Sequence, residues 1–158
     1  MNKITRIAIV IIVCLAVGYS SSEVTKSAIE TWYSALEKPS FNPPNWIFAP
    51  VWTLLFVLMG IAAGLVWDKI KEQNEEVKKA LGFFLIQLIL NAVWSYLFFG
   101  LKNPMLALIE IILLWLLIYE TFLQFKKINK TAGYLLIPYM AWVAFAAVLN
   151  GSIWWLNR

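Results

Sequence analysis

Three polar side chains recur at helical spacing within an apolar stretch of the chain. Gln87, Asn91 and Ser95 stand four residues apart, so a helix would place all of them on one face, with Trp94 beside them. Amide and hydroxyl groups are costly in a hydrocarbon environment unless they have hydrogen-bond partners. We therefore expect this face to point inward, where its polar groups either bind a ligand or hold a neighbouring helix.

A second face of the same kind occurs near the C-terminus. Tyr139, Trp142, Ala146 and Asn150 follow spacings of three and four residues, which also places them on one side of a helix. The small side chain of Ala146 would leave room for a ligand's ring between larger neighbours. Stacked aromatic side chains suit a planar conjugated ligand.

One carboxylate stands deep inside an apolar stretch. Glu110 lies within Leu106–Leu117, with no cation near it in sequence. An acid within a membrane segment is a candidate functional group, and a proton-coupled transporter could use it. The alternative is structural, because Glu110 follows Pro104 closely and lies within about 9 Å of the membrane surface by helical rise. Local partners would then satisfy the carboxylate.

The chain contains no histidine and a single cysteine, Cys14. The lone cysteine excludes an internal disulfide and a multi-cysteine metal site. Without histidine, the chain lacks the commonest metal ligand, the commonest general base and any serine–histidine triad. No conventional catalytic group is therefore evident.

The elements that must position these residues are membrane-spanning helices. Of the 158 residues, 61% are hydrophobic and 14% charged, whereas soluble domains average about 45–50% and about 25%. A spanning helix needs about 20 mostly apolar residues. Five continuous stretches meet this need, which predicts an all-α membrane protein, a five-transmembrane-helix bundle formed by one domain over residues 1–158. The stretches are Ile4–Ser22, Trp46–Ile70, Ala80–Leu101, Met105–Phe125 and Tyr134–Leu156.

Two features of the first two stretches permit more than one interpretation. Lys3 and Arg6 precede the apolar run Ile7–Val17, a pattern also typical of a cleavable signal peptide. We favour a retained first helix, because the run is long for a signal and the other helices need a partner. Gly60 and Gly64 form a GxxxG spacing, which permits close helix packing either within the chain or between two copies.

The distribution of cations predicts the orientation in the membrane. With five spans, nine lysines and arginines fall on the side of the N-terminus and four on the other. Because cations near helix ends favour the cytoplasmic side, the N-terminus should lie inside, and the C-terminus and the loop 23–45 outside. The net charge of +4 then reflects topology, and it gives no support for nucleic-acid binding.

The longest predicted connection, residues 23–45, has the composition of a stiff lid. It contains Trp32 and Tyr33 and, further on, Pro39, Pro43 and Pro44. Long loops in compact domains often cover binding sites, and proline restricts the backbone. The prolines alone would be equally typical of a helix start.

In their order and spacing, these segments resemble the tryptophan-rich sensory protein or translocator protein family, which includes the peripheral benzodiazepine receptor. The resemblance covers about residues 4–156. The matching motifs are Trp32-Tyr33, Lys38-Pro39, Pro43-Pro44, Phe48 and Trp52; Gln87, Asn91, Trp94-Ser95 and Phe98-Phe99; and Pro138-Tyr139, Trp142, Phe145-Ala146 and Leu149-Asn150.

The resemblance implies a homodimer of five-helix bundles in the lipid bilayer, in a bacterial cytoplasmic membrane. It also implies a pocket under the first loop that binds porphyrins such as protoporphyrin IX, and drug-like small molecules of the isoquinoline-carboxamide and benzodiazepine types. The matching pocket positions are Trp32, Tyr33, Trp52, Gln87, Asn91, Trp94, Trp142, Phe145 and Ala146. The sterol-recognition pattern of animal members needs a tyrosine, which Leu149–Arg158 lacks, and this argues against strong cholesterol binding.

Three functions follow as hypotheses. The first is a tetrapyrrole-binding protein in porphyrin handling or stress signalling. It would require no cofactor and would take metal-free porphyrin, or haem held without histidine ligation. Light- and oxygen-dependent porphyrin degradation, with tryptophans as redox partners, leaves its status as an enzyme open. The second is a proton-coupled transporter that uses Glu110. The third is a regulator that acts through a partner protein and senses the ligand only as a signal.

Overall fold

The structure is a computed structural model that describes residues 1–158, and it is entirely helical. Five of its helical segments are long and apolar enough to cross a membrane, which confirms the predicted fold class. In chain order, the elements are α1 (Lys3–Ile29), η1 (Tyr33–Ala35), η2 (Asn45–Ile47), α2 (Phe48–Trp67), α3 (Asn74–Ser95), η3 (Tyr96–Gly100), α4 (Pro104–Ile128), α5 (Lys130–Tyr134) and α6 (Ile137–Leu156).

Asparagine side chains mark the start of several helices. The side-chain oxygens of Asn2, Asn103 and Asn129 accept hydrogen bonds from backbone N–H groups in the first turns of α1, α4 and α5. Each cap satisfies a donor that has no partner within its helix. Pro104 then occupies the first turn of α4, where its missing N–H costs least.

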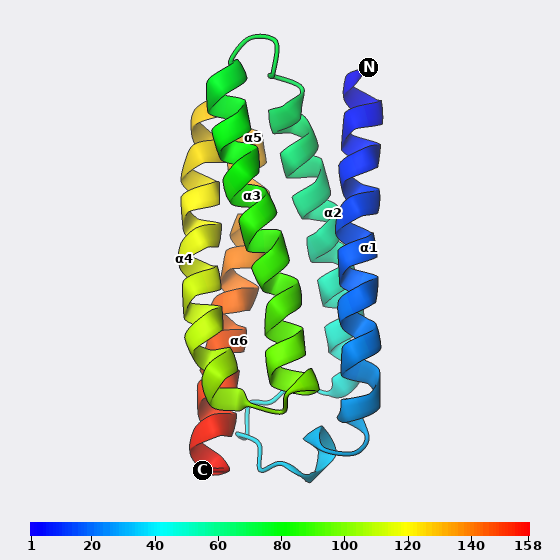
Figure 1. Cartoon of the computed structure of the whole chain (residues 1–158), viewed down its shortest axis with the longest axis vertical. Coiled ribbons are helices and arrows are strands. Elements are labelled where there is room, and N and C mark those ends of the chain that lie inside the picture. Colours follow the sequence, from blue (N-terminus) through cyan, green and yellow to red (C-terminus); the bar gives the residue numbers. More distant parts are fainter.

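The long helices run side by side as a bundle (Figure 1). The N-terminus lies at the end that holds the connection from α2 to α3. The C-terminus lies at the opposite end, together with the connection from α1 to α2 and the turn from α3 to α4 (Figure 1). The predicted lid and the C-terminus therefore share one end of the molecule.

The first helix belongs to the bundle and packs closely along α2. A Cβ atom added to Gly60 would lie 2.5 Å from the Cα of Ile11, and one added to Gly64 would lie 2.5 Å from the Cα of Ile7. Only glycine allows two backbones to approach this closely. The GxxxG pair therefore serves packing within the chain.

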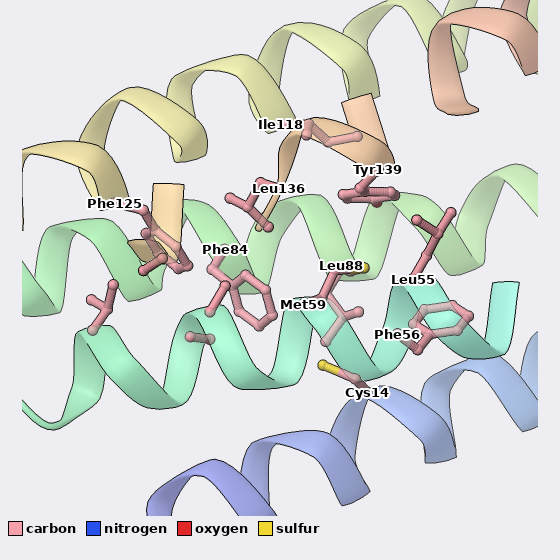
Figure 2. Close-up of a cluster of buried hydrophobic side chains, with 14 of the residues drawn as sticks. Cys14, Leu55, Phe56, Met59, Phe84, Leu88, Ile118, Phe125, Leu136 and Tyr139 are labelled. Carbon is pink, nitrogen blue, oxygen red and sulfur yellow. The ribbon is translucent and has the colours of Figure 1, made fainter. Parts of the chain in front are cut away.

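The core lies along the centre of the bundle. In Figure 2, Cys14 of α1, Met59 of α2, Leu88 of α3, Ile118 of α4 and Tyr139 of α6 belong to one cluster of buried side chains. All five long helices thus contribute to it, and their outer faces carry exposed apolar residues, as expected of a protein surrounded by lipid.

The end of the first helix differs from the prediction. Residues 23–29, assigned to the loop 23–45 by composition, continue α1 to Ile29. The helix accommodates the hydroxyl groups of this region, because Ser21 donates to the carbonyl oxygen of Val17 and Thr25 donates to that of Ser21. The connection is consequently shorter. From here on, the lid denotes residues 30–47.

Other boundaries also differ, and the larger differences lie in α3 and the last span. The third helix begins earlier, at Asn74, where Glu75 and Glu76 in its first turn suit the positive end of the helix dipole. It ends in the π-helical turn η3, in which the N–H of Leu101 bonds to the carbonyl oxygen of Tyr96. The last span is divided into α5 and α6, because Pro138 has no N–H with which to continue the helix.

Candidate functional site

A cavity of about 450 Å³ lies at the lid end of the bundle. Its walls come from the second half of α1, the first half of α2, the end of α3 with η3, and α6, and Tyr33 and Asn45 of the lid also line it. Most of the lining residues are hydrophobic. Both the size and the apolar lining are typical of small-molecule sites, which occupy about 300–1,000 Å³.

Aromatic rings from α2 and α6 form one part of the wall. The ring centroids of Trp52 and Phe56 are 5.7 Å apart, and those of Phe48 and Trp142 are 6.1 Å apart. Trp142 also lies 5.6 Å from Phe145. Each pair is within the range of favourable aromatic contacts. Trp52 and Trp142 thus each pack against neighbouring rings of the wall.

The π-helical turn adds a second aromatic group. Trp94 stacks on Phe98, with centroids 5.2 Å apart, and Phe99 lies 4.8 Å from Phe98. All three residues line the cavity. Wide turns of this kind occur frequently at functional sites.

Beside this aromatic wall, α3 and α6 share a buried polar network. The Tyr139 hydroxyl donates to Oε1 of Gln87 at 2.7 Å and accepts a hydrogen bond from Nδ2 of Asn91 at 2.8 Å. All three side chains are buried, and Asn91 also lines the cavity. Most of their polar atoms are therefore satisfied within the protein, whereas Nε2 of Gln87 has no partner.

A second polar contact joins three helices at the cavity wall. Nε1 of Trp94 donates to Oδ1 of Asn150 at 3.0 Å, and Nδ2 of Asn150 donates to the carbonyl oxygen of Pro104 at 2.7 Å. Asn150 thereby connects α3, α4 and α6. In contrast, the indole N–H of Trp142 is buried without a partner, so this cavity residue retains an unused donor.

Hydrogen bonds and aromatic contacts hold the lid in position. The Tyr33 hydroxyl donates to Oδ1 of Asn42 at 3.1 Å. At the end of the bundle, Glu37 N donates to Oδ1 of Asn157 at 3.0 Å, while Nδ2 of Asn157 donates to the Glu37 carbonyl oxygen at 2.9 Å. Phe41 lies 6.3 Å from Phe145 of the cavity wall. Burial raises the pKa of the Tyr33 phenol, an effect that its hydrogen bond to Asn42 opposes.

The structure brings most of the predicted pocket residues together. The lining includes Tyr33, Trp52, Asn91, Trp94, Trp142, Phe145 and Ala146. Trp32 and Gln87 are not among the lining residues. Trp32 instead packs its ring on Phe98, at 5.6 Å, and Gln87 faces Tyr139. In this structure, Trp32 and Gln87 therefore lie behind the cavity wall and contact residues of the wall and its polar network.

Glu110 lies outside the cavity lining. It is buried on α4, and neither of its carboxylate oxygens has a hydrogen-bond partner. The structural alternative, in which local groups satisfy this carboxylate, is therefore wrong for the protein groups around it. A buried polar group without partners is unusual and calls for an explanation.

The sequence prediction missed the whole contribution of α1. Leu15, Gly18, Thr25 and Lys26 are among the α1 residues that line the cavity. No motif identified them, and the loop assignment removed the last residues from consideration. A helical reading of residues 15–29 would have placed 15, 18, 22, 25, 26 and 29 on one face.

The chain is similar to known proteins over almost its whole length. The model of the TspO/MBR family matches residues 10–156. The chain is 46% identical over 158 residues to the tryptophan-rich protein TspO of Chlorobaculum tepidum, and 41% identical over 157 residues to the protein of that name in Archaeoglobus fulgidus, with 99% of each chain covered in both cases. It is 34% identical over 141 residues to the translocator protein of Bos taurus, which covers 89% of this chain and 83% of the relative.

Proposed function

Because this chain belongs to the TspO/MBR family, we propose that it is a membrane receptor whose cavity binds a flat, apolar ligand of the tetrapyrrole class, such as protoporphyrin IX. The observation that carries the proposal is the aromatic cavity of about 450 Å³ under the lid. Drug-like molecules with fused rings would compete for the same space.

The shape and chemistry of the walls favour such a ligand. Trp52, Trp94 and Trp142 reach the cavity from three different helices, so a planar molecule would meet rings on several sides. Burying its apolar faces there would contribute about 25 cal/mol per Å² removed from water. Ala146 keeps the α6 wall thin between Trp142 and Asn150, which leaves room for the ring system.

Few polar groups remain available to orient the ligand. The amide of Asn91 is partly engaged by Tyr139, and Asn150 is engaged by Trp94 and Pro104. The indole N–H of Trp142 has no partner. A ligand acceptor that reached this donor after a small side-chain movement would satisfy it, which makes Trp142 a candidate for a direct polar contact from α6.

We propose porphyrin handling or stress signalling as the cellular role. Porphyrin degradation in light would need oxygen as the co-reactant, and the lining tryptophans are the available electron donors. The absorbance of the bound porphyrin, followed with and without light and oxygen, distinguishes porphyrin binding from porphyrin degradation. A spectrum that stays constant under both conditions indicates binding alone, whereas bleaching that needs both indicates turnover.

Filling the cavity tests the binding proposal directly. Ala146→Phe places a ring inside the space, whereas Val148→Phe adds the same ring on the same helix at a side chain that is 58% exposed. In lipid nanodiscs, we expect Ala146→Phe to abolish the shift of the porphyrin absorbance band and Val148→Phe to retain it. Equal shifts in both variants would show that the porphyrin binds elsewhere or only to lipid.

A second candidate function, proton-coupled transport, depends on one observation. Glu110 holds a buried carboxyl with no protein partner, and such a group could take up and release a proton if water reached it. Proton-driven uptake of porphyrin into proteoliposomes, lost in Glu110→Gln, would support this function. Uptake that does not depend on the proton gradient, or that is unchanged in Glu110→Gln, would exclude proton-coupled transport.

We also propose an assembly and an orientation in the membrane. We propose a homodimer, a bacterial cytoplasmic membrane location, and a cytoplasmic N-terminus with the lid outside, on the basis of the family and the cation count. Protease access to the lid from either side of sealed vesicles would test the orientation, and cross-linking in the membrane would test the dimer.

A further inference from the structure

One charged side chain lines the cavity. Of its 26 lining residues, Lys26 is the only cation, and none is an aspartate or glutamate. Lys26 therefore carries the only charge in the lining, and its ion-pair partner, Glu23, does not itself line the cavity. The location of that charge therefore indicates where an anionic group on a ligand would be stabilised.

The α1 wall changes from apolar to polar along its length. Its inner part is formed by Leu15 and Gly18, and the part nearer the lid carries Ser22, Thr25 and Lys26. The hydroxyl groups of Ser22 and Thr25 already donate to carbonyl oxygens of their own helix, those of Tyr19 and Ser21. The ammonium group is consequently the strongest donor that this wall can offer to an anion.

The side chain of Lys26 is held where it can serve this purpose. Its Nζ donates to Oε1 of Glu23 at 2.6 Å and lies 5.5 Å from the ring centroid of Tyr19. Helical side chains lean toward the N-terminus, which brings the ammonium beside Tyr19, a residue that also lines the cavity. Glu23 is not a lining residue, so it holds the lysine from outside.

We propose that Lys26 anchors a carboxylate of the bound ligand, so that the cavity selects flat apolar molecules with an acidic group at one edge. This inference depends on the proposed function and specifies its ligand class. The apolar body of the ligand would lie among the aromatic rings, and its acidic edge would face the polar part of α1. Glu23 would compete with the ligand for the same ammonium.

The expected effect is moderate. The Lys26 side chain is 66% exposed, and ion pairs with this exposure are worth at most about 1 kcal/mol. Loss of the anchor should therefore weaken binding by about three- to fivefold. An effect of this size is measurable when the same protein is compared with two matched ligands.

The experiment uses protoporphyrin IX, which carries two carboxylates, and its dimethyl ester, which has the same ring and no acid. Both are titrated against the full-length protein in nanodiscs. Lys26→Gln should weaken binding of the diacid by about three- to fivefold and leave the ester unchanged. Glu23→Gln, which frees the lysine, should tighten binding of the diacid. Each ligand is compared across variants, so differences in lipid partitioning cancel.

Lys102→Gln is the matched control, because Lys102 lies in the turn between α3 and α4 at the same end and does not line the cavity. It should change neither affinity. Equal weakening of both ligands in Lys26→Gln would show a packing role, and no change in either would show an uninvolved lysine; both results overturn the inference. If the wild-type protein binds neither ligand, the proposed function itself fails.

Discussion

The indole N–H of Trp94 donates a 3.0 Å hydrogen bond to Oδ1 of Asn150, and this bond joins α3 to α6 at the cavity wall. Both residues line the cavity. Because Asn150 also bonds to the Pro104 carbonyl oxygen of α4, one amide fixes the relative positions of three helices. The walls of the site are thus held by side chains that belong to the site.

We expect Trp94→Phe to destabilise the protein. Polar contacts between membrane helices average about 0.6 kcal/mol, but this substitution also leaves a nearly fully buried oxygen of Asn150 without its donor, which costs about 1–3 kcal/mol. We therefore expect a loss of about 1–2 kcal/mol in the free energy of unfolding, measured by denaturant titration in detergent micelles. Trp46→Phe, at a side chain that is 74% exposed, should change it little. Equal effects would mean that the hydrogen bond contributes nothing.

Two glycine substitutions should have opposite effects on stability. In Gly60→Ala, the new Cβ would lie 2.5 Å from the backbone of Ile11, so α1 must move away from α2. In Gly82→Ala, the new Cβ meets nothing within 4 Å, and alanine in a helix is favoured over glycine by about 0.5–1 kcal/mol. Thermal unfolding should show a lower midpoint for the first variant and an unchanged or higher one for the second. A stable Gly60→Ala would contradict the close packing.

The attachment of the lid should weaken at alkaline pH. The neutral phenol of Tyr33 donates to Asn42, and burial raises its pKa above the ordinary value. A raised pKa in the folded state means that the stabilisation is complete below the ordinary tyrosine pKa, about 10, and is lost as the pH rises through the higher folded value. The phenolate absorbance of the wild-type protein minus that of Tyr33→Phe isolates this group. A difference in absorbance that titrates below the ordinary tyrosine pKa would contradict the raised pKa of Tyr33.

The sequence was sufficient to predict the bundle but not all of its ends. Continuous apolar runs of spanning length permit few alternatives to helices, which is why five were found. The predicted end of α1 was wrong because serine, threonine and charged residues suggest a loop. In the structure, the hydroxyl groups of Ser21 and Thr25 instead bond to carbonyl oxygens of the helix itself. Composition alone does not show whether such polar residues form a loop or continue a helix.

The candidate site was predictable to a similar degree. Helical spacing correctly placed Asn91 and Trp94 on an inward face, and the family motifs supplied Tyr33, Trp52 and Trp142. Spacing does not identify partners from another helix, however, and Gln87 proved to face Tyr139 rather than the cavity. Lys26 was missed for a related reason, because its position on the cavity wall depends on the helical continuation of α1.

A fluorescence titration tests whether the aromatic cavity binds a tetrapyrrole. Protoporphyrin IX is added to the solubilised protein while tryptophan fluorescence is recorded, for the wild type and for Trp142→Phe. We expect saturable quenching at micromolar ligand in the wild type, and weaker affinity in the variant, which loses a wall residue and its unpaired N–H. Quenching that does not saturate, or that is identical in the two proteins, would contradict tetrapyrrole binding in this cavity.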